Sequence, residues 1–140
     1  MSIRVGFGLI NYPFEDGFGF FRWVEMLERC GVDSVWQSDR LISTDNYLES
    51  LSALASLAGC TERIKFGMNA IVAPLRDPLV LAKQCATIDF LSNGRLLPMF
   101  GVGYPKAVEW DATGRSSDHR GSRANEMFEL LARLWSEESV

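Results

Sequence analysis

Short apolar runs alternate along the chain with segments whose apolar residues recur every three or four positions. Four such runs cover residues 3–10, 34–39, 65–72 and 96–103, and each is followed by an amphipathic segment. The unit repeats roughly every 30 to 35 residues. Runs this continuously apolar are typical of strands with both faces covered, so the pattern predicts a parallel sheet flanked by helices.

Turn and capping residues predict the ends of the first two helices. The first helix is predicted over 20–31 and closes at Gly31, because glycine accepts the left-handed backbone that ends many helices. The second is predicted over 46–59. Its cap is expected within the Ser-Thr-Asp run at 43–45, and Gly59 is expected to end it.

The third helix has the clearest start signal. Asp77 is placed to cap it, and Pro78 occupies the first helical position, where the missing N–H costs nothing. Asn93 and Gly94 are expected to end it. The last helix is predicted over about 121–137, with apolar residues at helical spacing that are expected to form core.

Two architectures fit four strand-helix units of the α/β class. A doubly wound sheet usually carries a glycine-rich phosphate loop after its first strand, but the turn after Ile10 contains neither GxGxxG nor GxxxxGK[ST]. The remaining architecture is the (β/α)8 barrel, of which four units are half. Pro98 weakens the fourth strand, because proline cannot donate to a strand ladder.

Composition narrows the function classes. The chain has 140 residues, 47% apolar and 23% charged, which suits one packed domain. The net charge of -4 includes no basic run for a nucleic-acid backbone. No apolar stretch reaches the roughly 20 residues of a membrane helix, and the N-terminus lacks a leader pattern, so we expect a cytoplasmic protein.

Cysteine and histidine usage disfavours metal chemistry. Cys30, Cys60 and Cys85 are far apart and odd in number, so we expect small buried side chains rather than a disulfide or a metal site. His119 is the single histidine, which leaves no histidine-rich metal set. Neither a Ser-His-Asp set nor a Cys-His pair is indicated, and the sequence identifies no catalytic acid or base.

A long block of the chain resembles a known family. APLRDPLVLAKQCATIDFLSNGRL at 73–96, followed by FGVGY and RGSRANEMFELLARLW, resembles the bacterial-luciferase-like flavin monooxygenases and their deazaflavin-dependent oxidoreductase relatives. The block combines a proline-arginine loop, a Lys-Gln pair early in the helix, an aspartate before SNGR and a glycine-rich fourth strand. Members have TIM (β/α)8 barrels and are usually about twice this length or more, so residues 1–140 are expected to be the N-terminal half of one such domain.

The resemblance implies a cofactor and a reaction class. It implies FMN, or alternatively the deazaflavin coenzyme F420, held at the C-terminal ends of the strands beside a small-molecule substrate. The expected protein is a flavin-dependent oxidoreductase or monooxygenase. The lack of an evident acid or base fits, because the cofactor supplies the bond-breaking chemistry while the protein orients it.

The strand ends supply the candidate site residues. In deazaflavin-dependent relatives an aspartate-histidine pair follows the second strand, and here arginine replaces the histidine. Relatives often carry a non-proline cis peptide after the third strand, which the resemblance places between Asn69 and Ala70. Candidate cofactor-binding residues are Asp39, Asn69, Ala70, Ile71, Val72, Gly103 and Tyr104, and candidate substrate-binding residues are Phe7, Trp36 and Arg40.

Half a barrel has consequences for assembly. The edges of the first and fourth strands would be unpaired, and the inner sheet face would be open. We therefore expect the chain to pair with a second copy or with the missing C-terminal half. A truncated enzyme, inactive alone, is the leading hypothesis, and a non-catalytic half-barrel that self-associates or binds flavin weakly is the alternative.

Overall fold

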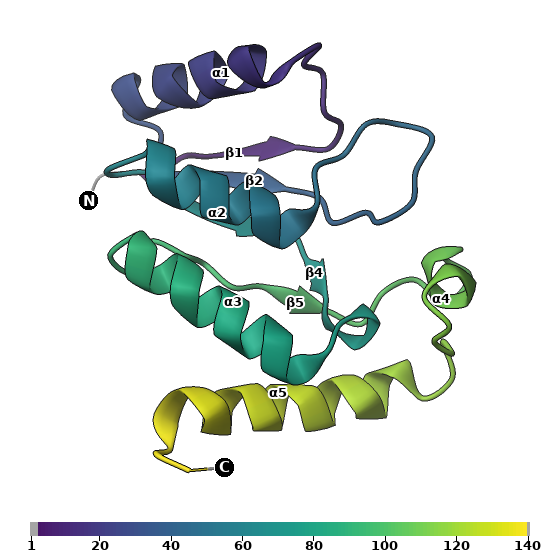
Figure 1. The fold of residues 1–140 in the computed structure, drawn as a ribbon. Helices are drawn as coiled ribbons and strands as arrows, with labels where there is room; N and C mark the ends of the chain where they lie inside the picture. The colour runs from purple at the N-terminus through teal and green to yellow at the C-terminus, as the bar shows by residue number, and fades with distance from the viewer. Residues whose placement is uncertain (1–2, 140) are drawn as a thin grey trace.

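The computed structural model describes residues 3–139 as strands and helices that alternate along the chain (Figure 1). The strands are β1 (Gly6–Leu9), β2 (Ser34–Gln37), β3 (Lys65–Met68), β4 (Ile71–Val72) and β5 (Phe100–Gly101). The helices are α1 (Gly17–Arg29), α2 (Ser50–Cys60), α3 (Pro78–Leu91), α4 (Glu109–Ala112) and α5 (Arg120–Ser136), with a 3-10 turn η1 (Ala73–Leu75) after β4.

All strand pairs are parallel, which confirms the α/β class with a parallel arrangement. β1, β2 and β3 form one sheet in that order, with Phe7, Val35 and Phe66 in register across it. β4 and β5 form a second, two-stranded ladder. A single bridge between Phe66 and Leu96 joins the two ladders.

The third and fourth strands are shorter than the apolar runs predict. The run 65–72 is divided by a cis peptide bond between Asn69 and Ala70, the position that the resemblance implies. In the run 96–103, only Phe100–Gly101 forms a strand. Pro98 lies between the Leu96 bridge and β5, where its missing N–H interrupts the ladder.

The core lies between the strands and the helices. The strand side chains Val35 and Phe66 are buried on the same side as Leu54 and Leu57 of α2. From α5, Ala124, Met127 and Leu131 close the core, so the predicted apolar stripe of the last helix is confirmed as core.

Trp36 covers the opposite face of the sheet. A Cβ added at Gly67 would lie 2.7 Å from the Trp36 ring and 2.4 Å from the Leu97 carbonyl oxygen, so only glycine fits beneath the indole. The indole Nε1 donates to Ser34 Oγ at 3.0 Å, at the start of β2. Trp36 is therefore held along the sheet face by packing and by this bond.

Several predicted helix ends are confirmed. Gly31 has a φ of 78° just after α1. Asp77 caps α3 by accepting from Val80 N at 3.0 Å, and Pro78 is its first residue. Gly94 follows α3 with a φ of 77°.

The predicted start and end of the second helix are wrong. The structure begins α2 at Ser50, and Glu49 rather than the 43–45 run caps it, because its carboxylate accepts from the backbone N–H groups of Leu51 and Ser52. Gly59 lies inside α2, which continues to Cys60.

The prediction that all three cysteines are buried is also wrong. Cys30 and Cys60 are exposed at the C-terminal ends of α1 and α2, and of the three cysteines Cys85 alone is buried. Burial raises the pKa of the Cys85 thiol to about 11.

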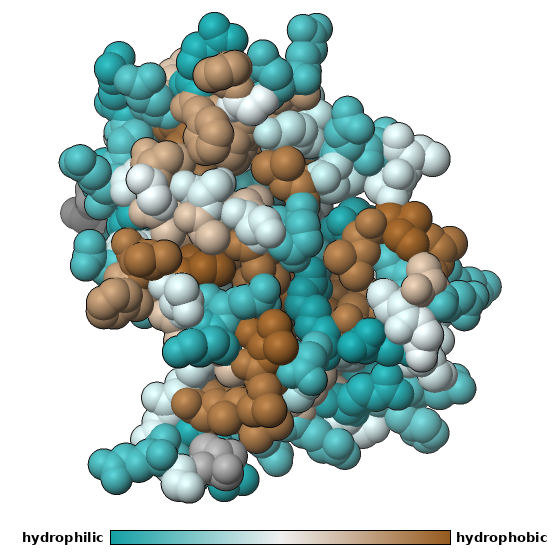
Figure 2. Space-filling model, in the orientation of Figure 1, coloured by the Kyte–Doolittle hydropathy of each residue, from teal (hydrophilic) through white to brown (hydrophobic). Residues whose placement is uncertain are grey.

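Unpaired edges and apolar side chains remain on the surface. Within the described chain β1 pairs only with β2, and β5 only with β4. Apolar patches lie among polar residues in Figure 2, and exposed apolar side chains include Phe18 on α1 and Phe90 on α3, which is 82% exposed. None of the helices over residues 3–139 is long and apolar enough to cross a membrane.

Arg95 connects the C-terminal ends of α2 and α3 to the segment that leads into β3. Its guanidinium donates to the carbonyl oxygens of Thr61 and Ile64, at 2.7 and 2.9 Å, and to the Thr61 hydroxyl. It also reaches Ala58 O in the last turn of α2, and its Nε donates to Ser92 O after α3. One side chain thus ties the ends of α2 and α3 to the start of β3.

Replacing Arg95 with methionine should lower the free energy of unfolding by about 3 kcal/mol, because several carbonyls that accept from a charged donor lose it. Arg29→Met is the matched control: the Arg29 side chain is 78% exposed, and within residues 3–139 it pairs only with Glu25 one turn away, so the loss should stay below about 0.5 kcal/mol. Urea unfolding of the two variants measures both values. Equal losses would contradict the structural role given to Arg95.

Candidate functional site

A pocket of about 300 Å³ lies where β2, β4 and β5 end. In Figure 1, α4 and the long loop between β2 and α2 lie at the end to which the strand arrows point. The pocket is lined by Ser38, Asp39, Arg40, Leu41, Asn69, Ala70, Val72, Leu75, Gly101, Gly103, Tyr104, Ala107, Glu109 and Trp110. The pocket therefore lies at the C-terminal ends of the strands, which is where barrel enzymes carry their active sites.

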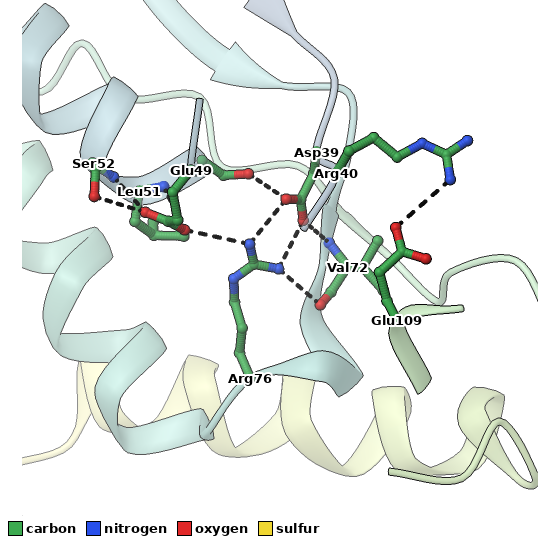
Figure 3. Close-up of polar contacts among 9 residues, drawn as sticks. Asp39, Arg40, Glu49, Leu51, Ser52, Val72, Arg76 and Glu109 are labelled. Atoms are coloured by element: carbon green, nitrogen blue, oxygen red, sulfur yellow. Dashed lines mark hydrogen bonds and ion pairs between the residues drawn. The ribbon is translucent and has the colours of Figure 1, made fainter. Parts of the chain in front are cut away.

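Asp39 and Arg76 form a buried ion pair at the pocket wall (Figure 3). Arg76 Nη1 donates to Asp39 Oδ2 at 2.7 Å and Nη2 donates to Oδ1 at 2.9 Å, so the pair is bidentate. The side chains are 2% and 11% exposed. Nη1 also donates to Val72 O at 3.1 Å, which folds the arginine back onto β4.

The Asp39 carboxylate has its full set of hydrogen bonds. The Ser50 hydroxyl at the start of α2 donates to Oδ1, and the Val72 N–H donates to Oδ2 at 2.8 Å. Each oxygen thus accepts two hydrogen bonds, which is the capacity of a carboxylate. Asp39 therefore holds β2, β4 and α2 together and has no acceptor site left for a ligand.

Glu49 extends this network. Its Oε1 lies 3.5 Å from Arg76 Nη2, while the carboxylate also caps α2. Partial burial raises the pKa of Glu49, but the hydrogen bonds from Ser52 and Leu51 and the charge of Arg76 outweigh it, and the pKa falls below its ordinary value. The ionised carboxylate is thus the form that the network stabilises.

The pocket floor consists of backbone and small side chains. Ala70 follows the cis peptide bond, and Gly101 and Gly103 come from the β5 end. Gly103 has a φ of 74°, and a Cβ there would lie 2.8 Å from Val72 Cγ1 and 3.0 Å from the Trp110 ring. Glycine is required at 103 by its backbone angle and by this close packing.

The α4 segment closes one side of the pocket. Trp110 is buried, and its Nε1 donates to Tyr104 O at 2.8 Å, which fixes the turn after β5. Glu109 lies beside it with its side chain 5% exposed. Its carboxylate Oε1 is 3.8 Å from Arg40 Nη1, and Figure 3 shows Arg40 reaching toward α4.

The structure gathers most, but not all, of the predicted site residues. The pocket contains Asp39, Arg40, Asn69, Ala70, Val72, Gly103 and Tyr104. The Trp36 indole lies along the sheet face and donates to Ser34 Oγ. Phe7 packs edge-on against Trp23 of α1, with ring centroids 5.9 Å apart. Ile71 is fully buried in the core. The side chains of these last three do not line the pocket.

The sequence does not predict Arg76, the partner of the pocket residue Asp39, or the pocket residues Glu109 and Trp110. Arg76 stands in the proline-arginine loop that carries the resemblance, so that motif was a usable signal. Glu109 and Trp110 lie in a segment between the last strand and the last helix. That segment has no apolar period, and nothing in the sequence marked them.

Most of the chain matches a known protein family. The family profile described as "Luciferase-like monooxygenase" matches residues 19–140. The chain belongs to this family. The resemblance stated from the sequence is confirmed.

Curated relatives of the chain are named for different cofactors. The chain is 31% identical over 122 residues to the F420-dependent glucose-6-phosphate dehydrogenase of Amycolatopsis mediterranei, covering 81% of this chain and 36% of that protein. It is 28% identical over 123 residues to the oxygenase component of the flavin-dependent trigonelline monooxygenase of Acinetobacter baylyi, covering 79% and 33%. The chain thus spans about a third of the length of these relatives.

A solved monooxygenase structure has the same fold over this part of its chain. The crystal structure of monooxygenase RslO1 from Streptomyces bottropensis superposes with a TM-score of 0.85 at 26% identity. The match covers 99% of this chain and 44% of that one. The arrangement of strands and helices seen here therefore occurs within a longer chain.

Replacing Asp39 with asparagine should lower the free energy of unfolding by about 3 to 5 kcal/mol, because it leaves Arg76 buried without its bidentate partner. The control is Asp45→Asn at an exposed aspartate whose carboxylate makes no hydrogen bond or ion pair within residues 3–139. That change should stay within about 0.5 kcal/mol. Chemical unfolding compares the two, and an Asp39 variant as stable as its control would show that the pair is dispensable.

Proposed function

We propose that this chain forms part of the cofactor site of a flavin- or deazaflavin-dependent oxidoreductase or monooxygenase acting on a small molecule. The observation that supports this most is the pocket at the strand ends, with its floor of Ala70, Gly101 and Gly103. Backbone and small side chains let a planar ring approach closely. Family membership supports the same conclusion.

The pocket residues suit a ring system held by packing. Its volume of about 300 Å³ is at the lower end of ligand sites and suits a ring, with the remainder of a cofactor lying outside it. The bound ring would supply the hydride or oxygen chemistry. The chain's own part is to support the ring on the Asn69–Ala70 and Gly103 backbone, and to place Tyr104 and Val72 beside it.

FMN is the proposed cofactor and F420 the alternative. Both types occur by name among the relatives. Arg40 stands where deazaflavin-dependent relatives commonly carry histidine, and this difference supports FMN. Arg40 lines the pocket and is proposed to face the substrate.

The proposed architecture is part of a (β/α)8 barrel. Five short parallel strands, with open edges at β1 and β5 within the described chain, support this. The remaining strands would come from a further part of the protein or from a second copy of the chain. Residues 1–140 are proposed to act as one domain unit in that assembly.

Replacing Gly103 with alanine should weaken FMN binding about tenfold or more, which corresponds to roughly 1.4 kcal/mol. The added Cβ would push against Val72 and Trp110 and displace the pocket floor. Gly114→Ala is the matched control, because Gly114 also has a positive φ of 64° but nothing within 4 Å of an added Cβ. The full-length protein that carries this chain is titrated with FMN, and separately with F420, by visible absorbance.

Two outcomes would contradict the proposal. If neither cofactor spectrum shifts with the unmodified protein, the flavin function fails and a non-catalytic half-barrel becomes the better account. If Gly103→Ala and Gly114→Ala bind cofactor equally well, the cofactor site is not this pocket.

A further inference from the structure

Glu109 has a largely buried side chain whose carboxylate oxygens keep a little exposed surface. Its side chain is 5% exposed, and no hydrogen bond reaches its carboxylate from any residue of the described range 3–139. Its ion pair with Arg40 spans 3.8 Å between Oε1 and Nη1, which is longer than a hydrogen bond. Asp39, in the same pocket wall, accepts four hydrogen bonds.

This contrast is informative because buried charges normally find donors. Nearly all buried polar groups in proteins are hydrogen-bonded, and a carboxylate taken from water without donors carries a large free-energy cost. Arg40 compensates the charge only in part, since its side chain is 51% exposed and its contact is long. Glu109 lines the pocket, so a pocket ligand is the group placed to complete its shell.

The charge of Glu109 also selects among ligands. A ligand hydroxyl or ammonium group donates to the carboxylate, whereas a ketone or ether oxygen of the same shape brings a lone pair toward a negative charge. An anionic ligand would have to compete with Glu109 for Arg40. A site built around a buried acceptor therefore rejects analogues that lack the matching donor.

We propose that Glu109 is a substrate-binding residue that accepts a hydrogen bond from a hydroxyl or amine group, and that the substrates of this pocket carry such a donor. Arg40, which also lines the pocket, pairs with the Glu109 carboxylate from the same side. The proposal rests on the proposed function in placing substrate in this pocket beside the ring. It deepens that function by naming the substrate class.

The test uses two probes that differ in the donor alone, cyclohexanol and cyclohexanone. Their affinities for the full-length protein are measured by ligand-detected NMR titration, with and without FMN. The unmodified protein should prefer the alcohol by roughly tenfold or more, the range of a hydrogen bond to a charged group. Glu109→Met should abolish the preference, and Glu109→Gln, which keeps a neutral acceptor, should retain part of it.

Asp111→Asn is the matched control. Asp111 is an exposed acid on the same short helix, and it lines a different surface pocket, so its replacement should leave the alcohol preference unchanged. Visible titration with FMN on every variant separates a lost donor contact from a displaced α4. In Glu109→Met the FMN affinity should fall by less than the alcohol affinity does.

The inference is overturned if the unmodified protein shows no alcohol preference, or if Glu109→Met keeps it. An equal weakening of both probes and of FMN in Glu109→Met would likewise overturn it, because Glu109 would then act only by holding α4. If the unmodified protein binds neither FMN nor F420, the proposed function fails. The probe ratio measured without cofactor still decides the role of Glu109.

Discussion

The ion pair between Asp39 and Arg76 is the interaction on which the pocket depends. The chain leaves the first sheet at Asn69, so β4 pairs with β5 and has no ladder to β2. The Asp39 carboxylate, just after β2, connects the two strands by accepting a hydrogen bond from the Val72 N–H of β4. Arg76 also donates to this carboxylate. The pocket wall is therefore a cross-link between two ladders that share one bridge.

The charged groups at and behind the pocket wall have different roles. A carboxylate that accepts four hydrogen bonds is a structural group, and Asp39 is thus a positioning residue whose own oxygens are occupied. Arg76 is neutralised between Asp39 and Glu49. Arg40 and Glu109 keep unused hydrogen-bonding capacity within the described chain, and the proposed substrate contacts fall to them.

Local signals in the sequence were enough to predict much of the fold. Asp77 and Pro78 fixed the start of α3, and Gly31 the end of α1, because caps and left-handed residues act within a few positions. The start of α2 was missed because Glu49, which is not among the strongly preferred caps, performs that role. The apolar runs predict longer strands than the structure has, because residues beyond the ends of β3 and β5 are also apolar although they do not continue the ladders of these strands.

The site was harder to predict because its contacts are distant in sequence. Strand-end logic found Asp39, Gly103 and Tyr104, since parallel strands end at one edge. It could not show that Asp39 is saturated, because the partner Arg76 lies 37 positions away. Glu109 is brought to the pocket by an irregular segment, and no periodic pattern reports such a placement.

A double-mutant cycle on Asp39 and Arg76 tests the central claim most directly. Asp39→Asn, Arg76→Gln and the double variant are compared for unfolding free energy and FMN affinity. The account predicts that the two single changes do not add, with a coupling energy of about 1 to 3 kcal/mol in stability and weaker FMN binding in each variant. Effects that add to within about 0.5 kcal/mol, with FMN binding unchanged, would contradict it.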